Sequence, residues 1–157
     1  MKTHWAWISG ISISGLFFTG ALLLFLFWQK SVSEAIPETP ESIQIVKKTT
    51  MDFALAVKSN DLSLFRNQTS SAFRKKYSQE VFDAAFSGFI QQNINLMAVE
   101  KYQPILAAAP AITKDGTLII RGHYDTRPSQ IKFDYDYVLA GDEWKISGIN
   151  IEVVPVN

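Results

Sequence analysis

The chain has 157 residues, with 15 basic and 15 acidic side chains and a formal net charge of zero. Nucleic-acid binding relies on an excess of positive charge, so we expect no nucleic-acid partner. The chain has no cysteine and two histidines, which excludes disulfide bonds and a metal site built from histidine and cysteine.

The first predicted element is a transmembrane helix. An apolar stretch without a charged residue runs from Trp5 to Trp28. At ~1.5 Å per residue its ends are roughly 34 Å apart, which matches the hydrocarbon core of a bilayer and its edges. Tryptophan prefers the membrane–water interface, so we expect Trp5 and Trp7 to anchor one interface and Trp28 the other. Residues 1–30 are therefore assigned to a tail and a single span.

A cleaved signal peptide is the alternative for this stretch. Signal peptides have apolar regions of about 7–15 residues, which is shorter than the stretch found here. The tripeptide Ser33-Glu34-Ala35 resembles a cleavage site, but it lies far from the apolar region, and Pro37 follows it. We favour a retained anchor, and keep a secreted domain as the alternative.

The expected location is the bacterial inner (cytoplasmic) membrane, with the C-terminal domain in the periplasm. A short N-terminal tail followed by a long domain favours this orientation. The positive-inside rule does not decide it, because Lys2 and Lys30 balance each other across the span. The absence of cysteine fits a bacterial extracytoplasmic domain.

One face of the span carries small residues. Ala6, Gly10 and Ser14 recur every four residues and so share a helix face. Small residues let two helix backbones approach closely in lipid. We therefore predict that this face is a candidate helix–helix interface, although small residues also occur in spans that only anchor.

A linker and a series of helices follow. Residues 31–39 are a short polar linker, and Thr39 with Pro40 predicts the start of a long helix that ends at Asn60-Asp61. Shorter helices are expected through Phe65 and after Ser70. Ser78 then caps a helix from Gln79 to about Asn93. The apolar positions at helical spacing are Ile43, Val46, Phe53, Val57, Phe82, Ala85, Phe86 and Phe89.

After Asn95 the pattern changes to strands. Pro104 and Pro110 make the first of these irregular. Alternation predicts strands over 118–126, 131–139 and 144–154, with turns at Asp115-Gly116 and Gly141-Asp142. In the last strand, the apolar residues on either side of Ser147-Gly148 share a face only if a bulge lies there.

Charge complementarity predicts a register for the two middle strands. If facing residue numbers sum to about 257, Arg121 faces Asp136, His123 faces Asp134 and Asp125 faces Lys132. In this register Gly122 lies opposite Tyr135 and leaves room for the ring. A turn near Pro128-Ser129 joins the two strands.

Three segments carry recognisable packing motifs: Gly-His-Tyr-Asp-Thr at 122–126, Phe-Asp-Tyr-Asp-Tyr at 133–137, and Trp-Lys-Ile-Ser-Gly-Ile-Asn-Ile at 144–151. Together they resemble the nuclear-transport-factor-2-like superfamily, the cystatin-like α+β cone. The resemblance covers about residues 40–154, within a domain assigned to 40–157. It implies an α+β fold in which a curved antiparallel sheet wraps around a long N-terminal helix, with a pocket at the wide end.

That superfamily includes ketosteroid-isomerase-like enzymes, binding modules and the periplasmic domains of type IV secretion scaffold proteins. An isomerase-like site would need a carboxylate inside the cone and hydrogen-bond donors for an oxyanion. Strand alternation places Asp125, Asp134 and Asp136 on the face opposite the aromatic residues, so we expect them to point outward. His123 next to Asp134 is interpreted as a surface pair rather than as a general base and its orienting group. The candidate pocket or core lining is Tyr124, Phe133, Tyr135 and Tyr137.

The sequence therefore favours a membrane-anchored interaction or assembly module, an accessory or scaffold subunit of a larger membrane complex. The type IV secretion scaffold proteins share this plan of short tail, one span and cone domain. The expected partners are the lipid bilayer and other membrane-protein subunits. We assign no catalytic residue, cofactor or metal ligand. The alternative is a small-ligand-binding or ketosteroid-isomerase-like enzyme domain.

Overall fold

The computed structural model describes residues 32–35 and 39–156. The expected span lies outside the described residues, and its interface tryptophans and small-residue face lie outside them as well. These residues are Trp5, Trp7 and Trp28, and Ala6, Gly10 and Ser14. No helix among the described residues combines the length and the apolar character needed to cross a membrane.

The domain begins with the long helix that the sequence predicts. Helix α1 spans Pro40–Lys58, with Thr39 as its N-cap and Pro40 in the first turn. The Thr39 hydroxyl accepts a hydrogen bond from the Ser42 amide, and the Ser42 hydroxyl accepts one from the Thr39 amide. This reciprocal pair satisfies two amides that have no partner within the helix. The helix ends just before Asn60, whose φ of 53° is left-handed.

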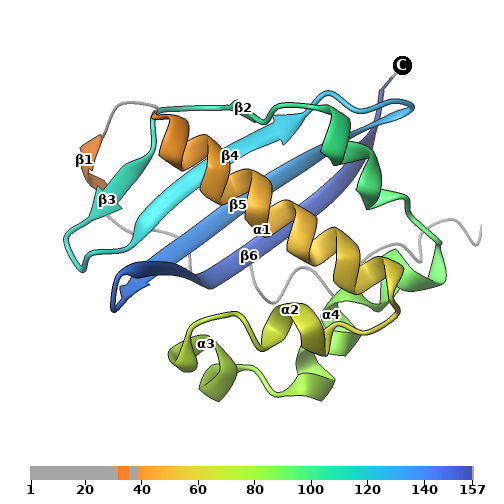
Figure 1. Ribbon diagram of the computed structural model, residues 1–157, viewed down its shortest axis with the longest axis horizontal. Coiled ribbons are helices and arrows are strands. Elements are labelled where there is room, and N and C mark those ends of the chain that lie inside the picture. The colour runs from red at the N-terminus through yellow and green to blue at the C-terminus, as the bar shows by residue number, and fades with distance from the viewer. Residues whose placement is uncertain (1–31, 36–38, 157) are drawn as a thin grey trace, which may run out of the picture.

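Three further helices follow in quick succession. Their bounds are Ser63–Arg66 for α2, Ser71–Lys76 for α3 and Gln79–Gln91 for α4. The Ser78 hydroxyl caps α4, as predicted, and the Ser70 hydroxyl caps α3. A 3-10 helix, Leu96–Lys101, was not expected from the sequence. In Figure 1, α1 lies across one face of the sheet and α2, α3 and α4 gather beside it.

The described residues form a six-stranded sheet in which every pair of neighbours is antiparallel. The order is β1-β3-β4-β5-β6, and β2 pairs with β4. The strands are Val32–Ala35 (β1), Ile105–Leu106 (β2), Ala111–Thr113 (β3), Leu118–Tyr124 (β4), Ser129–Ala140 (β5) and Glu143–Pro155 (β6). The α+β class is therefore shown. Four residues of the segment expected to be a linker form the edge strand β1.

The predicted bulge in the last strand is confirmed. Asp136 faces Gly148 and Tyr137 faces Ile146, so Ser147 is the extra residue in β6. This residue returns Ile149 and Ile151 to the face that carries Ile146. All three isoleucines are buried.

The predicted register of β4 and β5 is wrong by two residues. Facing residue numbers sum to 255, so Arg121 lies opposite Asp134 and His123 lies opposite Lys132. Gly122 faces Phe133 instead of Tyr135. A shift of two keeps every side chain on its own face, so the division into an apolar and a polar face is unaffected.

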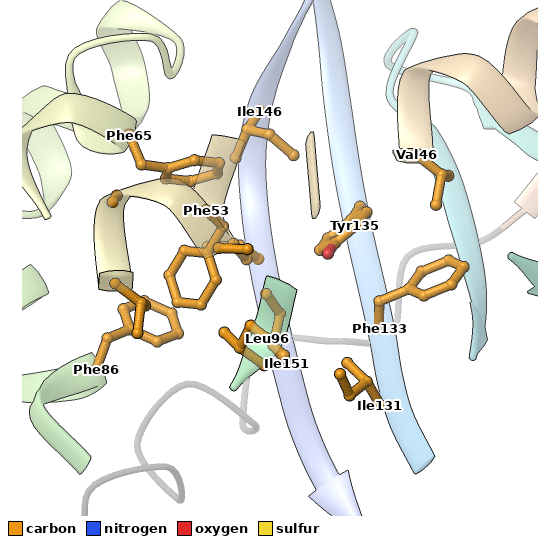
Figure 2. Packing of buried hydrophobic residues seen from close by; sticks show 14 of the residues in the cluster. Val46, Phe53, Phe65, Phe86, Leu96, Ile131, Phe133, Tyr135, Ile146 and Ile151 are labelled. Atoms are coloured by element: carbon orange, nitrogen blue, oxygen red, sulfur yellow. The ribbon is translucent and has the colours of Figure 1, made fainter. Parts of the chain in front are cut away.

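The core fills the space between α1 and the sheet. Phe53 from α1 meets Phe65, Phe86 and Phe89 edge-on, with ring centroids 5.0–5.6 Å apart. Figure 2 shows Phe53, Phe65 and Phe86 beside the row of side chains that β5 presents, which includes Phe133 and Tyr135. Such edge-to-face pairs add to the stabilisation that burial of the rings provides.

Candidate functional site

Three tyrosines of the predicted pocket lining meet two threonines of α1. The Tyr124 hydroxyl donates to the Thr50 hydroxyl at 3.2 Å, and the Tyr135 hydroxyl lies 2.9 Å from the same oxygen. The Tyr137 hydroxyl donates to the Thr49 hydroxyl at 3.0 Å. The structure thus brings Tyr124, Tyr135 and Tyr137 together under α1, and Phe133 packs between Tyr124 and Tyr135.

This network is closed to solvent. All three tyrosines and Thr50 are at most 1% exposed. Burial raises the pKa of Tyr124 to about 12, and it raises the pKa values of Tyr135 and Tyr137 further. The phenols therefore stay protonated at neutral pH and act as hydrogen-bonding groups. Their geometry fastens α1 to the sheet.

The carboxylates of the strands lie on the opposite face of the sheet, as alternation predicts. The Arg121 Nε donates to the Asp134 Oδ2 at 2.7 Å across β4 and β5. His123 Nε2 lies 3.3 Å from the Oδ1 of Asp125, two residues further along the chain. The predicted pairing of His123 with Asp134 is therefore wrong, and the corrected register is the reason. We call the face that carries Arg121, His123, Lys132, Asp134 and Asp136 the polar face.

The carboxyl group of Asp134, on the polar face, has a strongly raised pKa. Burial raises its pKa from 3.8 to about 6, and the nearby charges of Asp136 and Glu152 act in the same direction. The Arg121 guanidinium opposes this shift but does not cancel it. Asp136 is also buried, and it lies against the bare backbone of Gly148.

A groove of about 370 Å³ opens between α1 and the end of the β5–β6 hairpin. Its lining carries both charge signs, with Lys48 and Asp52 from α1 and Glu143 and Lys145 from β6. The half-buried Trp144 lines it as well. Lys48 pairs with Asp52 at 2.6 Å, and Lys145 pairs with Glu143, so these four groups neutralise one another. The groove is a surface hollow of mixed character, because Phe65, Tyr137 and Ile146 also line it beneath these charges.

Metal binding finds no support in the part of the chain that the structure describes. No three histidine, aspartate or glutamate side chains within 32–35 and 39–156 come together as a metal would require.

Sequence reasoning missed Thr49 and Thr50. They occupy buried positions of α1, where apolar residues are the rule, and both hydroxyls bind tyrosines of the sheet. The available signal was a pair of small polar residues at helix positions facing an apolar strand. Helical periodicity alone treats such residues as breaks in the apolar stripe.

Comparison with models of protein families, with curated proteins and with solved structures found no significant match to this chain.

Proposed function

We propose that the protein is a single-pass membrane protein whose C-terminal α+β domain is an interaction or assembly module of a larger membrane complex. In this proposal Trp5 and Trp28 mark the ends of the retained span, and the domain is a cone of the nuclear-transport-factor-2-like type on the periplasmic side of a bacterial inner membrane. The partners are other membrane-protein subunits.

The observation that carries the proposal is the buried tyrosine–threonine network between α1 and the sheet. In an enzyme or small-ligand binder of this shape, the inner face of the sheet lines an open pocket. Here Tyr124, Tyr135 and Tyr137 instead use their hydroxyls to hold α1. Asp134 and Asp136, which could serve as bases, lie on the other face. The domain therefore offers its outer surfaces, which suits binding to other proteins.

The span supplies the second element of the proposal. Ala6, Gly10 and Ser14 form a face on which another membrane helix can pack closely. Gly10 lies at the centre of this face, so replacing it with leucine would hold a partner helix away and keep the segment apolar.

The test compares Gly10→Leu with Gly15→Leu in the full chain. Gly15 lies about 140° around the helix from Gly10, so the same substitution there leaves the small-residue face intact. Membranes are extracted with a mild detergent, the tagged protein is recovered, and co-purifying membrane proteins are quantified by mass spectrometry.

We expect Gly10→Leu to lower recovery of a defined set of membrane proteins at least fivefold and Gly15→Leu to leave it unchanged, with equal amounts of both variants in the membrane. Equal recovery from both variants would limit the span to anchoring. A mature N-terminus near Ile36, found by intact-mass measurement, would contradict the retained anchor and the proposal with it.

A further inference from the structure

One end of the sheet carries two turns together with the start of β1. Asp115-Gly116 lies between β3 and β4, Gly141-Asp142 lies between β5 and β6, and both turns lie at the left of Figure 1. Val32, the first residue of β1, lies opposite Thr113, the last residue of β3. We call this end, formed by Val32 and residues 114–116 and 139–143, the turn end.

The stretch between the expected span and β1 is short. Only Gln29, Lys30 and Ser31 separate Trp28 from Val32. Four residue steps span at most roughly 14 Å even when fully extended. β1 runs from the turn end into the sheet, so the first described residue after the expected span, Val32, lies at the turn end. A bilayer that ends at Trp28 therefore lies close to the turn end.

The turn end carries an exposed apolar side chain two residues before the Gly141-Asp142 turn. Leu118, the first residue of β4, faces Tyr137 of β5. Leu139 lies two residues beyond Tyr137 on β5, toward the turn. Leu139 is 58% exposed, the largest exposed fraction among the large apolar side chains of the described residues. Its cross-strand neighbour is the half-buried Trp144. Leucine next to tryptophan is a combination that suits the boundary between headgroups and acyl chains.

We propose that the turn end rests on the lipid bilayer and that Leu139 inserts at the headgroup boundary. This inference depends on the proposed function, because it requires the segment between Trp5 and Trp28 to be a retained span. The domain is then held against the membrane in one orientation, and the polar face and the groove are presented at a fixed height above the membrane.

The charges of the turn end identify the kind of contact. The turn end carries one basic residue, Lys114, with Lys145 next to it in β6, and three acidic residues, Asp115, Asp142 and Glu143. Attraction to anionic lipids therefore does not drive the contact, and it should form equally well on zwitterionic lipid and at high salt.

The opposite end of the sheet provides an internal control. Leu139 and Gln130 are nine residue steps apart on β5, which is roughly 30 Å of extended strand. The exposed Arg127 in the β4–β5 loop lies beyond Gln130. In the proposed orientation a probe at Arg127 stays in water, well outside the reach of groups in the bilayer.

The experiment uses single-cysteine variants of the full chain, which has no native cysteine. Leu139→Cys and Arg127→Cys are labelled with an environment-sensitive fluorophore and reconstituted in phosphatidylcholine vesicles with and without a doxyl-labelled lipid quencher. We expect the probe at position 139 to lose at least half of its emission to the quencher, and the probe at position 127 to lose less than a tenth. If Leu139→Cys lowers the thermal unfolding midpoint, Asp142→Cys in the adjacent turn replaces it.

Two failures are distinguishable. Extraction of the vesicles with alkaline carbonate reports on the span alone. Release of the protein would overturn the retained anchor, and with it both the proposed function and this inference. Retention of the protein with an unquenched probe at position 139 would overturn only the membrane contact. Leu139 would then be left as a candidate contact for a protein partner. Quenching only with anionic lipid would contradict the apolar nature of the contact.

Discussion

Asp134 makes the stability of the domain depend on pH. Its side chain is 18% exposed, and its pKa rises from 3.8 to about 6 on folding because burial outweighs the Arg121 hydrogen bond. A raised carboxyl pKa means that the folded state binds the proton more tightly than the unfolded state. The stabilisation of the folded state by this tighter proton binding is therefore complete below pH 4, and it is lost as the pH rises through 6.

We expect Asp134→Asn to remove this dependence. Asparagine keeps an acceptor for Arg121 and carries no charge. As the pH rises from 4 to 7, the free energy of unfolding of the variant should therefore rise by about 2–3 kcal/mol relative to that of the parent. Urea unfolding at a series of pH values measures the difference. The same relative stability at both pH values would show that Asp134 titrates with an ordinary pKa.

Position 122 requires glycine because a neighbouring backbone approaches it closely. A Cβ built there would lie 2.2 Å from the carbonyl oxygen of Ile105 and 2.7 Å from the Phe133 ring. The ring has room to move, but the backbone oxygen belongs to β2 and cannot give way without breaking the pairing with β4. Gly122→Ala should therefore destabilise the domain by roughly 3 kcal/mol, the upper range of overpacking effects.

Gly88→Ala is the matched control for Gly122→Ala. It lies inside α4, where a new Cβ would meet only the Gln92 side chain at 3.7 Å. Gly88→Ala should stabilise the domain by about 0.5–1 kcal/mol, because alanine loses less backbone freedom in a helix. Thermal unfolding of both variants gives the comparison, and equal effects of the two substitutions would refute the close contact at Gly122.

At the scale of elements, the bulge at Ser147 keeps the last strand in the core. Deleting Ser147 would return β6 to strict alternation and move Ile149 and Ile151 to the polar face. These side chains are 8% and 5% exposed. Losing their burial costs roughly 3–6 kcal/mol, which is comparable to the whole stability of many domains.

We therefore expect the deletion variant to lose cooperative thermal unfolding and its near-ultraviolet circular dichroism. Ser147→Ala is the control, because it keeps the residue count and should change the stability by less than about 0.5 kcal/mol. A deletion variant that unfolds cooperatively at the parent temperature would mean that β6 tolerates a regular pairing.

The helix starts and the bulge were predictable because the signals are local. Thr39 and Ser78 cap helices through bonds to residues three positions away. The bulge follows from the order of apolar residues within one strand. For the helix starts, the local window contains both bonded groups. For the bulge, it contains the apolar residues that have to share the core face, although their pairing partners lie in β5.

The register of β4 and β5 was not predictable from the same kind of signal. Both registers place Gly122 opposite an aromatic ring, and both keep the apolar face intact. Charge pairs favoured the wrong one, because exposed ion pairs contribute little compared with packing. The contact of the Ile105 backbone with Gly122 and the hydrogen bond between Thr50 and Tyr135 are long-range, and no local pattern contains them. Strand β1 escaped prediction for the same reason, since its four residues are defined only by pairing with β3.

At the scale of the whole molecule, the proposed membrane contact depends on the short stretch of sequence between Trp28 and β1. Burial of one leucine is worth about 1.5–3 kcal/mol at most, which is too little to hold a freely diffusing domain on a bilayer. A short tether raises the effective concentration of the turn end at the surface and makes this weak contact sufficient. The contact should therefore depend on tether length.

Inserting twelve glycine and serine residues between Lys30 and Ser31 tests this dependence. The tether then has a root-mean-square length of about 20 Å, so the domain can leave the surface and rotate. We expect lipid quenching of a probe at position 139 to fall toward the value measured at position 127. Thermal unfolding should not change, because β1 and its pairing with β3 remain. Replacing Gln29-Lys30-Ser31 with Gly-Ser-Gly changes composition at constant length and should preserve the quenching. If the long insertion left the quenching intact, the turn end would bind lipid through more than Leu139, and the short tether would not be what holds it there.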